Sequence, residues 1–197
     1  IIAFRNLRKN GLYSSINIAG LATGISCSVL ILLWVVDEVS FDKFLPKYDR
    51  LYQVYIKAEF DSKMNVWNSV PLPTYEAIKE RSSYISNSTV TGWGGERLLT
   101  VGEKRLIRPG YYVSEEFLEM FEYPVLSGDP STALDEPSTI VITKELSQAL
   151  FGDEDPMGQT IKVEDEGSLI VAAVLENVPG NSSFEFDYLL PWKYREQ

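Results

Sequence analysis

The sequence holds few of the residues with which proteins usually do chemistry. Histidine is absent from all 197 residues, which removes the commonest general base, the Ser-His-Asp and Cys-His nucleophile systems and most zinc sites. The one cysteine, Cys27, lies inside a long apolar run, so no disulfide can form within the chain. No pair stands out among the 28 acidic residues as a general acid and base. The sequence therefore predicts a protein that is not an enzyme and that has no cofactor and no metal site.

Two glycine-containing stretches are better explained as turns than as binding sites. "GWGGERL", from Gly92, has too few glycines for a phosphate loop and leads into a strand-like stretch rather than a helix. "GDEDPMG", from Gly152, lacks the alternating ligand spacing and terminal glutamate of an EF-hand loop. The four tryptophans, at 34, 67, 93 and 192, are expected to be core or interface anchors, with Trp34 at a membrane boundary.

Charge divides the chain into a short basic part and a long acidic part. Residues 1–36 carry a net charge of +3, which leaves −13 for the remainder of a chain whose total is −10. A domain this acidic repels nucleic-acid backbones and anionic lipid surfaces. We therefore expect no nucleic-acid partner. The sequence begins at an isoleucine and stops at "KYREQ", and we expect it to be a fragment of a longer protein.

Residues 12–36 form a stretch of 25 residues without a formal charge. As a helix this stretch is roughly 37 Å long, more than the roughly 30 Å of a bilayer core. A cleaved signal peptide is shorter and ends at small residues, whereas this run continues into "DEVSFDKF". The stretch is therefore predicted to be a retained transmembrane helix, with residues 37–48 as a polar neck that extends the helix a turn or two outward.

The charges that flank the apolar run predict its orientation. Arg5, Arg8 and Lys9 precede it, and three acids follow it closely. Because basic flanks stay in the cytoplasm, residues 37–197 are expected on the periplasmic side of a bacterial inner membrane. Residues 1–11 alternate apolar and basic side chains, which fits a short interfacial helix. A positive flank without fixed structure fits the spacing equally well.

Three small residues recur at every fourth position of the predicted span. Gly20, Gly24 and Ser28 share one stripe of the helix, where a second helix backbone can approach closely. A single anchor in lipid needs no such stripe, although small residues are also frequent in membrane spans in general. We interpret the stripe as a packing face for a partner helix.

Beyond the neck, the pattern predicts an α+β domain with a mixed sheet. Alternating stretches predict strands at 51–60, 64–70, 87–94, 97–109, 159–179 and 184–192, several of them in hairpins. "PTYEAIKER" and "SEEFLEMF" predict short helices, the second with Ser114 as its N-cap. "STIVITKELSQALFG" predicts a buried strand, then Thr143 as N-cap, a helix and Gly152 as C-cap.

The order of these segments resembles the MacB/FtsX-type permeases of bacterial ABC transporters. "FRNLRKNGLYSSINIAGLATGISCSVLILLWV" resembles their first membrane helix. "PGYYVSEEFLEMFEYPVLSGD", "STIVITKELSQALFGDEDPMGQTIKV" and "LIVAAVLENVPGNSSFEFDYLLP" resemble successive segments of their MacB-like periplasmic core domain. The match covers essentially the whole chain; Ala173, where many members carry glycine, is a departure within a strand.

The resemblance implies a porter-like α/β part with an inserted β-rich, Sabre-like subdomain. By position, residues 49–95 would be the first porter-like half, residues 96–183 the Sabre-like subdomain, and residues 184–197 the return to the porter part. A second porter half and three further membrane helices would be absent.

The resemblance also implies a permease subunit that couples ATP hydrolysis by a cytoplasmic ABC ATPase to movement of the periplasmic domain. The implied role is mechanotransmission and efflux of periplasmic substrates such as antimicrobial peptides or toxins. The implied partners are the ATPase and a second permease copy, as a homodimer or with a related permease. A periplasmic membrane-fusion protein is left open. Two alternatives remain: the ligand-sensing domain of a membrane receptor, and a lipoprotein-extracting relative of the same family. A cell-division regulator fits less well, because its outside domain is smaller.

Overall fold

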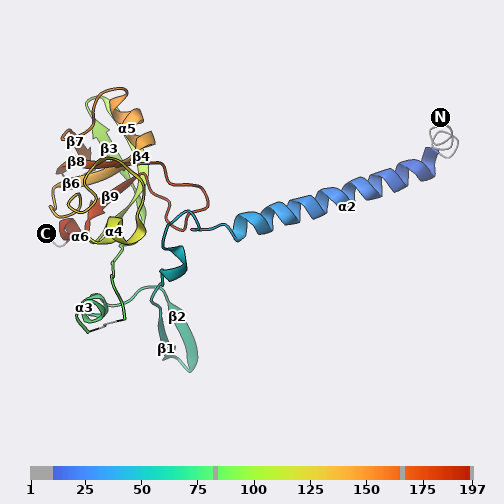
Figure 1. The fold of residues 1–197 in the computed structure, drawn as a ribbon, viewed down its shortest axis with the longest axis horizontal. Helices are drawn as coiled ribbons and strands as arrows, with labels where there is room; N and C mark the ends of the chain where they lie inside the picture. The colour runs from blue at the N-terminus through green and yellow to red at the C-terminus, as the bar shows by residue number, and fades with distance from the viewer. Residues whose placement is uncertain (1–10, 82–83, 165–166, 196–197) are drawn as a thin grey trace. The chain divides into compact units, whose positions relative to one another are not determined.

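The computed structural model describes residues 11–81, 84–164 and 167–195, and the chain divides into two units, Ile1–Phe41 and Asp42–Gln197. The first unit contains α2 (Gly11–Glu38), the helix drawn in blue in Figure 1. Among the described residues, α2 is the only helix long and apolar enough to cross a membrane. All its side chains but one, the partly exposed Ser14, are exposed, as expected for a helix whose apolar surface meets lipid.

The prediction that the neck continues this helix by one or two turns is wrong. The helix ends at Glu38, and the amide and hydroxyl of Ser40 both donate to the carbonyl of Asp37. Asp42 then adopts a left-handed backbone conformation with φ 57°. A left-handed residue cannot continue an α-helix, so the neck is a folded connection rather than a longer lever.

The second unit starts with a short 3-10 helix, η1 (Tyr48–Arg50), and a hairpin of β1 (Ile56–Phe60) and β2 (Lys63–Trp67). These strands pair only with each other in the described structure. The helix α3 (Leu72–Arg81) follows, as the sequence predicted, although the first strand begins five residues later than expected. Figure 1 shows the hairpin and α3 outside the main sheet.

A seven-stranded mixed sheet forms the rest of this unit. Its strands are β3 (Gly95–Val101), β4 (Lys104–Val113), β5 (Val125–Gly128), β6 (Thr139–Thr143), β7 (Thr160–Val163), β8 (Gly167–Leu175) and β9 (Tyr188–Pro191). Their order is β5-β8-β6-β9-β4-β3-β7, and β7 also pairs with β8, so the sheet closes on itself. Strand β6 is parallel to β8 and β4 is parallel to β9, while the other neighbours are antiparallel. Closure leaves few free strand edges.

Three short helices accompany the sheet: α4 (Phe117–Phe121), α5 (Lys144–Phe151) and α6 (Trp192–Arg195). The predicted caps of α5 are confirmed, because the Thr143 side chain accepts a hydrogen bond from the amide of Leu146, and Gly152, with φ 69°, is the C-cap. The predicted cap of α4 is wrong. Ser114 instead directs its hydroxyl to Thr89 and Val90, and Glu116 occupies the N-cap position without a side-chain bond.

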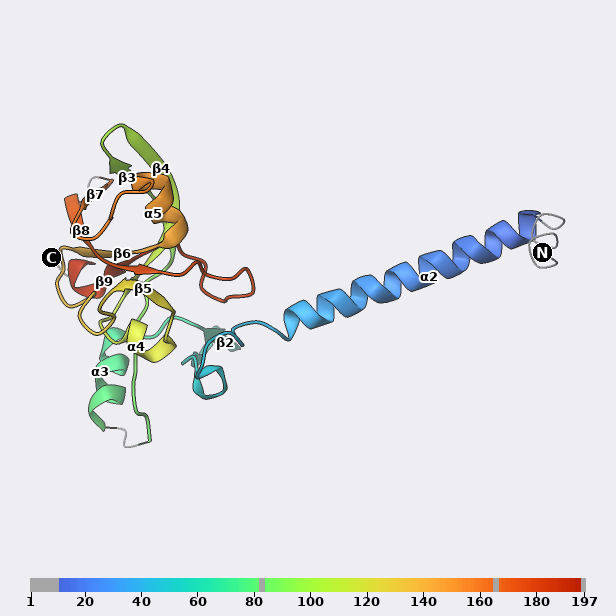
Figure 2. The same ribbon diagram turned by 45° about the horizontal axis from the view of Figure 1, so that its top comes forward.

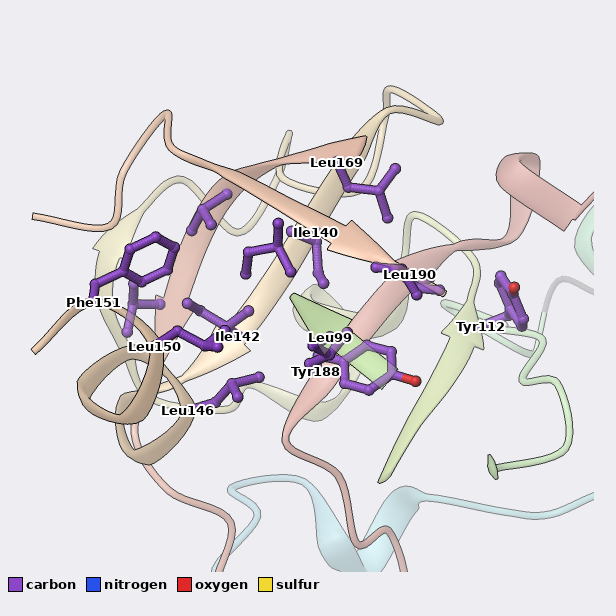
Figure 3. Close-up of a cluster of buried hydrophobic side chains, with 14 residues drawn as sticks. Leu99, Tyr112, Ile140, Ile142, Leu146, Leu150, Phe151, Leu169, Tyr188 and Leu190 are labelled. Carbon is purple, nitrogen blue, oxygen red and sulfur yellow. The ribbon is translucent and has the colours of Figure 1, made fainter. Parts of the chain in front are cut away.

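Two apolar clusters cover the two faces of the sheet. Strand β6 illustrates the division, since Ile140 and Ile142 belong to one cluster and Val141 to the other. Figure 3 shows the first cluster, in which Leu146 and Leu150 of α5 lie against the sheet residues. The second cluster is rich in aromatic rings from α4 and from the segment before β9. The structure is therefore the α+β fold with a mixed sheet that the sequence predicted.

Some predicted boundaries differ from those observed. The strand expected at 87–94 is reduced to one bridge between Thr91 and Val113. A side chain at Gly94 would meet the Tyr111 ring at 2.6 Å, so this position favours a residue without a side chain. Strand β9 belongs to the same sheet as β3 to β8, so this sheet joins residues on both sides of position 183. The division into porter-like and Sabre-like parts stays a prediction from the resemblance.

Candidate functional site

The described residues offer no obvious centre for chemistry. No group of three or more histidine, cysteine, aspartate or glutamate side chains within 11–81, 84–164 and 167–195 is arranged to hold a metal ion. A hollow of about 210 Å³ lies beside Asp187 and the N-terminus of α5, partly open to solvent; Figure 2 shows α5 beside the sheet. Ligand sites usually measure about 300–1,000 Å³ and bury most of the ligand. This hollow does not favour the ligand-sensing alternative.

The best-defined functional feature is the neck junction, which we define as residues 42–47 together with the loop 181–186. Residue 42 opens the second unit, directly after the helical unit in the chain. Its backbone amide donates to the carbonyl of Asn181 at 2.9 Å. Its carboxylate accepts from the amide of Ser183 at 2.8 Å and also from the Ser183 hydroxyl. Hydrogen bonds to a carboxylate are about twice as strong as neutral ones, so the chain is fixed at this residue.

An apolar anchor follows three residues later. Leu45 is only 2% exposed and lies in the aromatic cluster of α4. Next to it, the ring of Phe44 packs on Tyr123 with 5.9 Å between centroids. Burying a leucine side chain contributes roughly 1.5–3 kcal/mol. The neck is therefore held by packing as well as by hydrogen bonds.

Lys47 completes the junction at the C-terminal end of α4. Its ammonium group pairs with Glu122 at 2.5 Å and donates to the Glu119 carbonyl at 3.4 Å. A cation is favourable at this position, because the last carbonyl groups of a helix carry partial negative charge. Burial raises the pKa of Tyr123 to about 12; the nearby hydroxyl of Ser182 opposes the shift and the charge of Asp42 adds to it. The phenol therefore stays neutral beneath the junction.

Sequence reasoning did not identify this junction. Asp42 was seen only as one of the acids that flank the span, and Ser183 only as part of the "NSS" in the family-like segment. The two residues are 141 positions apart. The one local signal is the apolar pair Phe44 and Leu45, which directly follows the charged Asp42 and Lys43 in "SFDKFL".

The small-residue stripe lies along one face of α2, as its spacing requires. Gly20, Gly24 and Ser28 line a shallow groove of about 450 Å³, together with the larger side chains of Leu21, Ile25, Val29 and Leu32. The Ser28 hydroxyl donates to the Gly24 carbonyl at 2.8 Å, so it is satisfied within its own helix. Apart from its chain neighbours and the helix's own backbone, no described atom lies within 4 Å of a Cβ built at either glycine. The role of the stripe as a packing face stays a prediction, and the topology charges Arg5, Arg8 and Lys9 lie outside the described residues.

The structure excludes a core position for Trp67 and Trp93, while the interface-anchor alternative and the membrane-boundary position of Trp34 stay predictions. Trp34, Trp67 and Trp93 are 64%, 44% and 79% exposed, and only Trp192 packs partly against a core cluster. Exposed tryptophans at separate places do not define a ligand shelf.

Comparison with known proteins places the chain in one family. The family described as "MacB-like periplasmic core domain" matches residues 14–197. None of the curated proteins matches the chain.

Two solved structures have a similar fold. A domain of a putative permease protein from Porphyromonas gingivalis has 24% sequence identity and a TM-score of 0.55, over 61% of this chain and 56% of that one. The periplasmic region of MacB from Actinobacillus actinomycetemcomitans has 17% identity and a TM-score of 0.52, over 64% of this chain and 56% of that one. The chain thus spans a little over half the length of these solved domains.

Proposed function

Because the chain belongs to the family of MacB-like periplasmic core domains, a component of ABC-type permeases, we propose that it transmits force from a cytoplasmic ATPase to the periplasm. In this proposal α2 spans the bacterial inner membrane with its N-terminus in the cytoplasm, and residues 37–197 are periplasmic. ATP hydrolysis by a partner ABC ATPase moves α2, and the neck junction carries the movement into the sheet. The movement drives export of periplasmic substrates such as antimicrobial peptides or toxins.

The observation that carries this proposal is the fixation of the chain directly after the apolar helix. The carboxylate of Asp42 accepts hydrogen bonds from the loop 181–186, and Leu45 is buried in the second apolar cluster. A flexible linker at this place would absorb a displacement of the helix instead of passing it on. A domain that only binds a ligand would not need so firm an attachment at its entry point.

We further propose that the stripe of Gly20, Gly24 and Ser28 packs against a helix of a second permease copy or of the same permease. Gly24→Leu is expected to weaken assembly, because the new side chain would fill the groove where the partner backbone approaches. Ser26→Leu is the matched control, since this residue lies on the opposite side of the helix and receives the same side chain. Cross-linking in detergent micelles or blue native electrophoresis would measure assembly. Normal assembly of Gly24→Leu would refute this face.

The coupling proposal is tested without knowledge of the cargo. The permease, assembled with its ATPase in nanodiscs, carries Cys27→Ser and a spin label at Ser62→Cys in the exposed hairpin turn. Electron paramagnetic resonance would measure the distance between the spin labels on two permease copies, with ATP and with ADP. We expect a nucleotide-dependent distance in the parent protein. The Asp42→Ala variant should lose most of that change while ATP hydrolysis continues.

Two controls separate loss of coupling from loss of folding. Asp42→Asn keeps one side-chain oxygen to accept from Ser183 and suits the left-handed backbone, so it should retain most of the response. Asp49→Ala removes an exposed acid of the same segment and should behave as the parent protein does. A distance that never depends on the nucleotide in the parent protein would overturn the proposal. Survival of cells in a cationic antimicrobial peptide would then test the cargo class.

A further inference from the structure

We call residues 52–94 the hairpin–helix segment, and those of them that the structure describes lie outside the hydrophobic core. Neither core cluster includes a described residue of this segment. Phe60, Met64 and Val66 of the hairpin are 73%, 59% and 60% exposed. An isolated two-stranded sheet is only marginally stable in water. The position of this segment must therefore depend on a few specific contacts with the seven-stranded sheet and α4.

Two side-chain contacts of α3 converge on Glu116, at the N-terminal end of α4. The hydroxyl of Tyr75 donates to Oε2 of Glu116 at 2.9 Å, and the ammonium group of Lys79 pairs with Oε1. Both partners come from α3. The Glu116 side chain is only 13% exposed. Burial alone would raise the pKa of Glu116, but hydrogen bonds from Lys79 and other donors hold that pKa below its ordinary value.

A second polar contact lies close by. The Ser114 hydroxyl is paired with the Thr89 hydroxyl at 2.8 Å and accepts from the amide of Val90 at 3.3 Å. It attaches the chain where the hairpin–helix segment returns to the sheet. Thus Ser114 and Glu116, which both lie just before α4, hold the segment at two points.

The opposite end of α4 meets the neck. Lys47 contacts Glu119 and Glu122, and Leu45 packs in the cluster that contains Phe117 and Phe121. Helix α4 has only five residues, so its two ends are about 7 Å apart at 1.5 Å per residue. A displacement of the neck that shifts this short helix must also shift Glu116.

We propose that α4 relays movement of the neck to the hairpin–helix segment, with Glu116 as the positioning residue for α3. The inference rests on the proposed coupling function and identifies a part of the domain that moves. Interfaces of packed side chains have discrete arrangements, which is how small shifts are passed between neighbouring elements.

Hydrogen exchange of the full chain in nanodiscs tests the contact at Glu116. Glu116→Gln should raise the exchange rates of the α3 amides by about tenfold, because a charged hydrogen bond to a partly buried carboxylate is lost. The matched control is Glu115→Gln, which removes the neighbouring acid and its 2.6 Å ion pair with Lys193 of α6. This control should leave α3 unchanged. Equal exchange of α3 in the two variants would overturn the role of Glu116.

A charge exchange distinguishes positioning from general support of the fold. Glu116→Lys combined with Lys79→Glu should bring the α3 exchange rates back toward those of the parent chain, whereas either change alone should not. Failure of the double variant to improve on the single ones would count against an electrostatic contact.

The relay itself is tested by combining variants at the two ends of α4. Lys47→Ala should raise the exchange rates of the α3 amides in the parent chain. In the Glu116→Gln background it should raise them little further, because both substitutions act through α4. Independent, additive effects would refute the relay. These measurements use no ATP, so they can fail while the nucleotide-dependent distance change at the Ser62 label is observed. Conversely, the relay measurements can succeed while that distance change is absent.

Discussion

The seven-stranded sheet and the hairpin–helix segment are neighbours in the chain and are stabilised in different ways. The sheet closes on itself around Leu99, Ile142 and Tyr188, each of which is fully buried. The hairpin has no buried residue, and α3 is held through Tyr75 and Lys79. Apolar burial resists displacement in every direction, whereas a few polar contacts can break and re-form. We therefore call the closed sheet the frame and expect the hairpin–helix segment to be the part that moves.

The largest expected effect on stability is loss of the aromatic ring that packs α4 against the frame. Phe117→Ala leaves a cavity among the rings of Phe121, Tyr123 and Phe184, and should lower the free energy of unfolding by about 3–5 kcal/mol. Phe60→Ala removes the same ring from the hairpin and should change it by less than about 0.5 kcal/mol. Urea unfolding of the full chain in detergent, followed by near-ultraviolet circular dichroism, would measure both. Similar losses would contradict the division into frame and mobile part.

A smaller loss of stability is expected at Gly110, whose backbone packs directly against the ring of Tyr188. A methyl group at Gly110 would lie 2.4 Å from the ring of Tyr188, so Gly110→Ala should cost about 1–3 kcal/mol through overpacking. Gly95 is the cross-strand partner of Gly110, and its nearest contact would be 3.9 Å away, at Arg97. Gly95→Ala should therefore be close to neutral in the same unfolding measurement. A neutral Gly110→Ala would show that Tyr188 is free to move.

Acid should affect the two regions in opposite directions. Hydrogen bonding lowers the pKa of Glu116 overall, so its contribution is present above its ordinary pKa and is lost as the pH falls through the lowered value. Burial raises the pKa of Asp187, although the charge of Arg108 opposes the shift. The stability of the frame therefore falls as the pH rises through this raised pKa. Hydrogen exchange between about pH 5 and 3, corrected for intrinsic rates, should show α3 loosening while the amides of β9 do not. Asp187→Asn should remove the response of the frame, and parallel loosening of both regions would contradict the assignment.

The smallest effect on global stability is expected at the hairpin turn. Asp61 and Ser62 both have positive φ, 52° and 58°, which is the geometry of a type I′ turn. Ser62→Gly should relieve roughly 1 kcal/mol of backbone strain and slow exchange of the hairpin amides. The unfolding midpoint of the frame should not change, because the hairpin opens on its own. A raised midpoint would show that hairpin and frame unfold together.

The sequence by itself determined the elements whose signals are local. The uncharged run before Asp37 predicted α2, and "TKELSQALFG" predicted α5 with both caps. The order of segments indicated the family to which the chain belongs. Such features depend on residues a few positions apart, which the sequence displays directly.

Only the tertiary structure decided where the chain is held. Asp42 meets Ser183 across 141 positions, and Ser114 bonds to Thr89 rather than capping its own helix. The closure of the sheet and the contact of Glu116 with α3 are likewise long-range. A polar side chain can satisfy its hydrogen bonds locally or across the fold, and which partner it takes depends on what packing brings within about 3 Å.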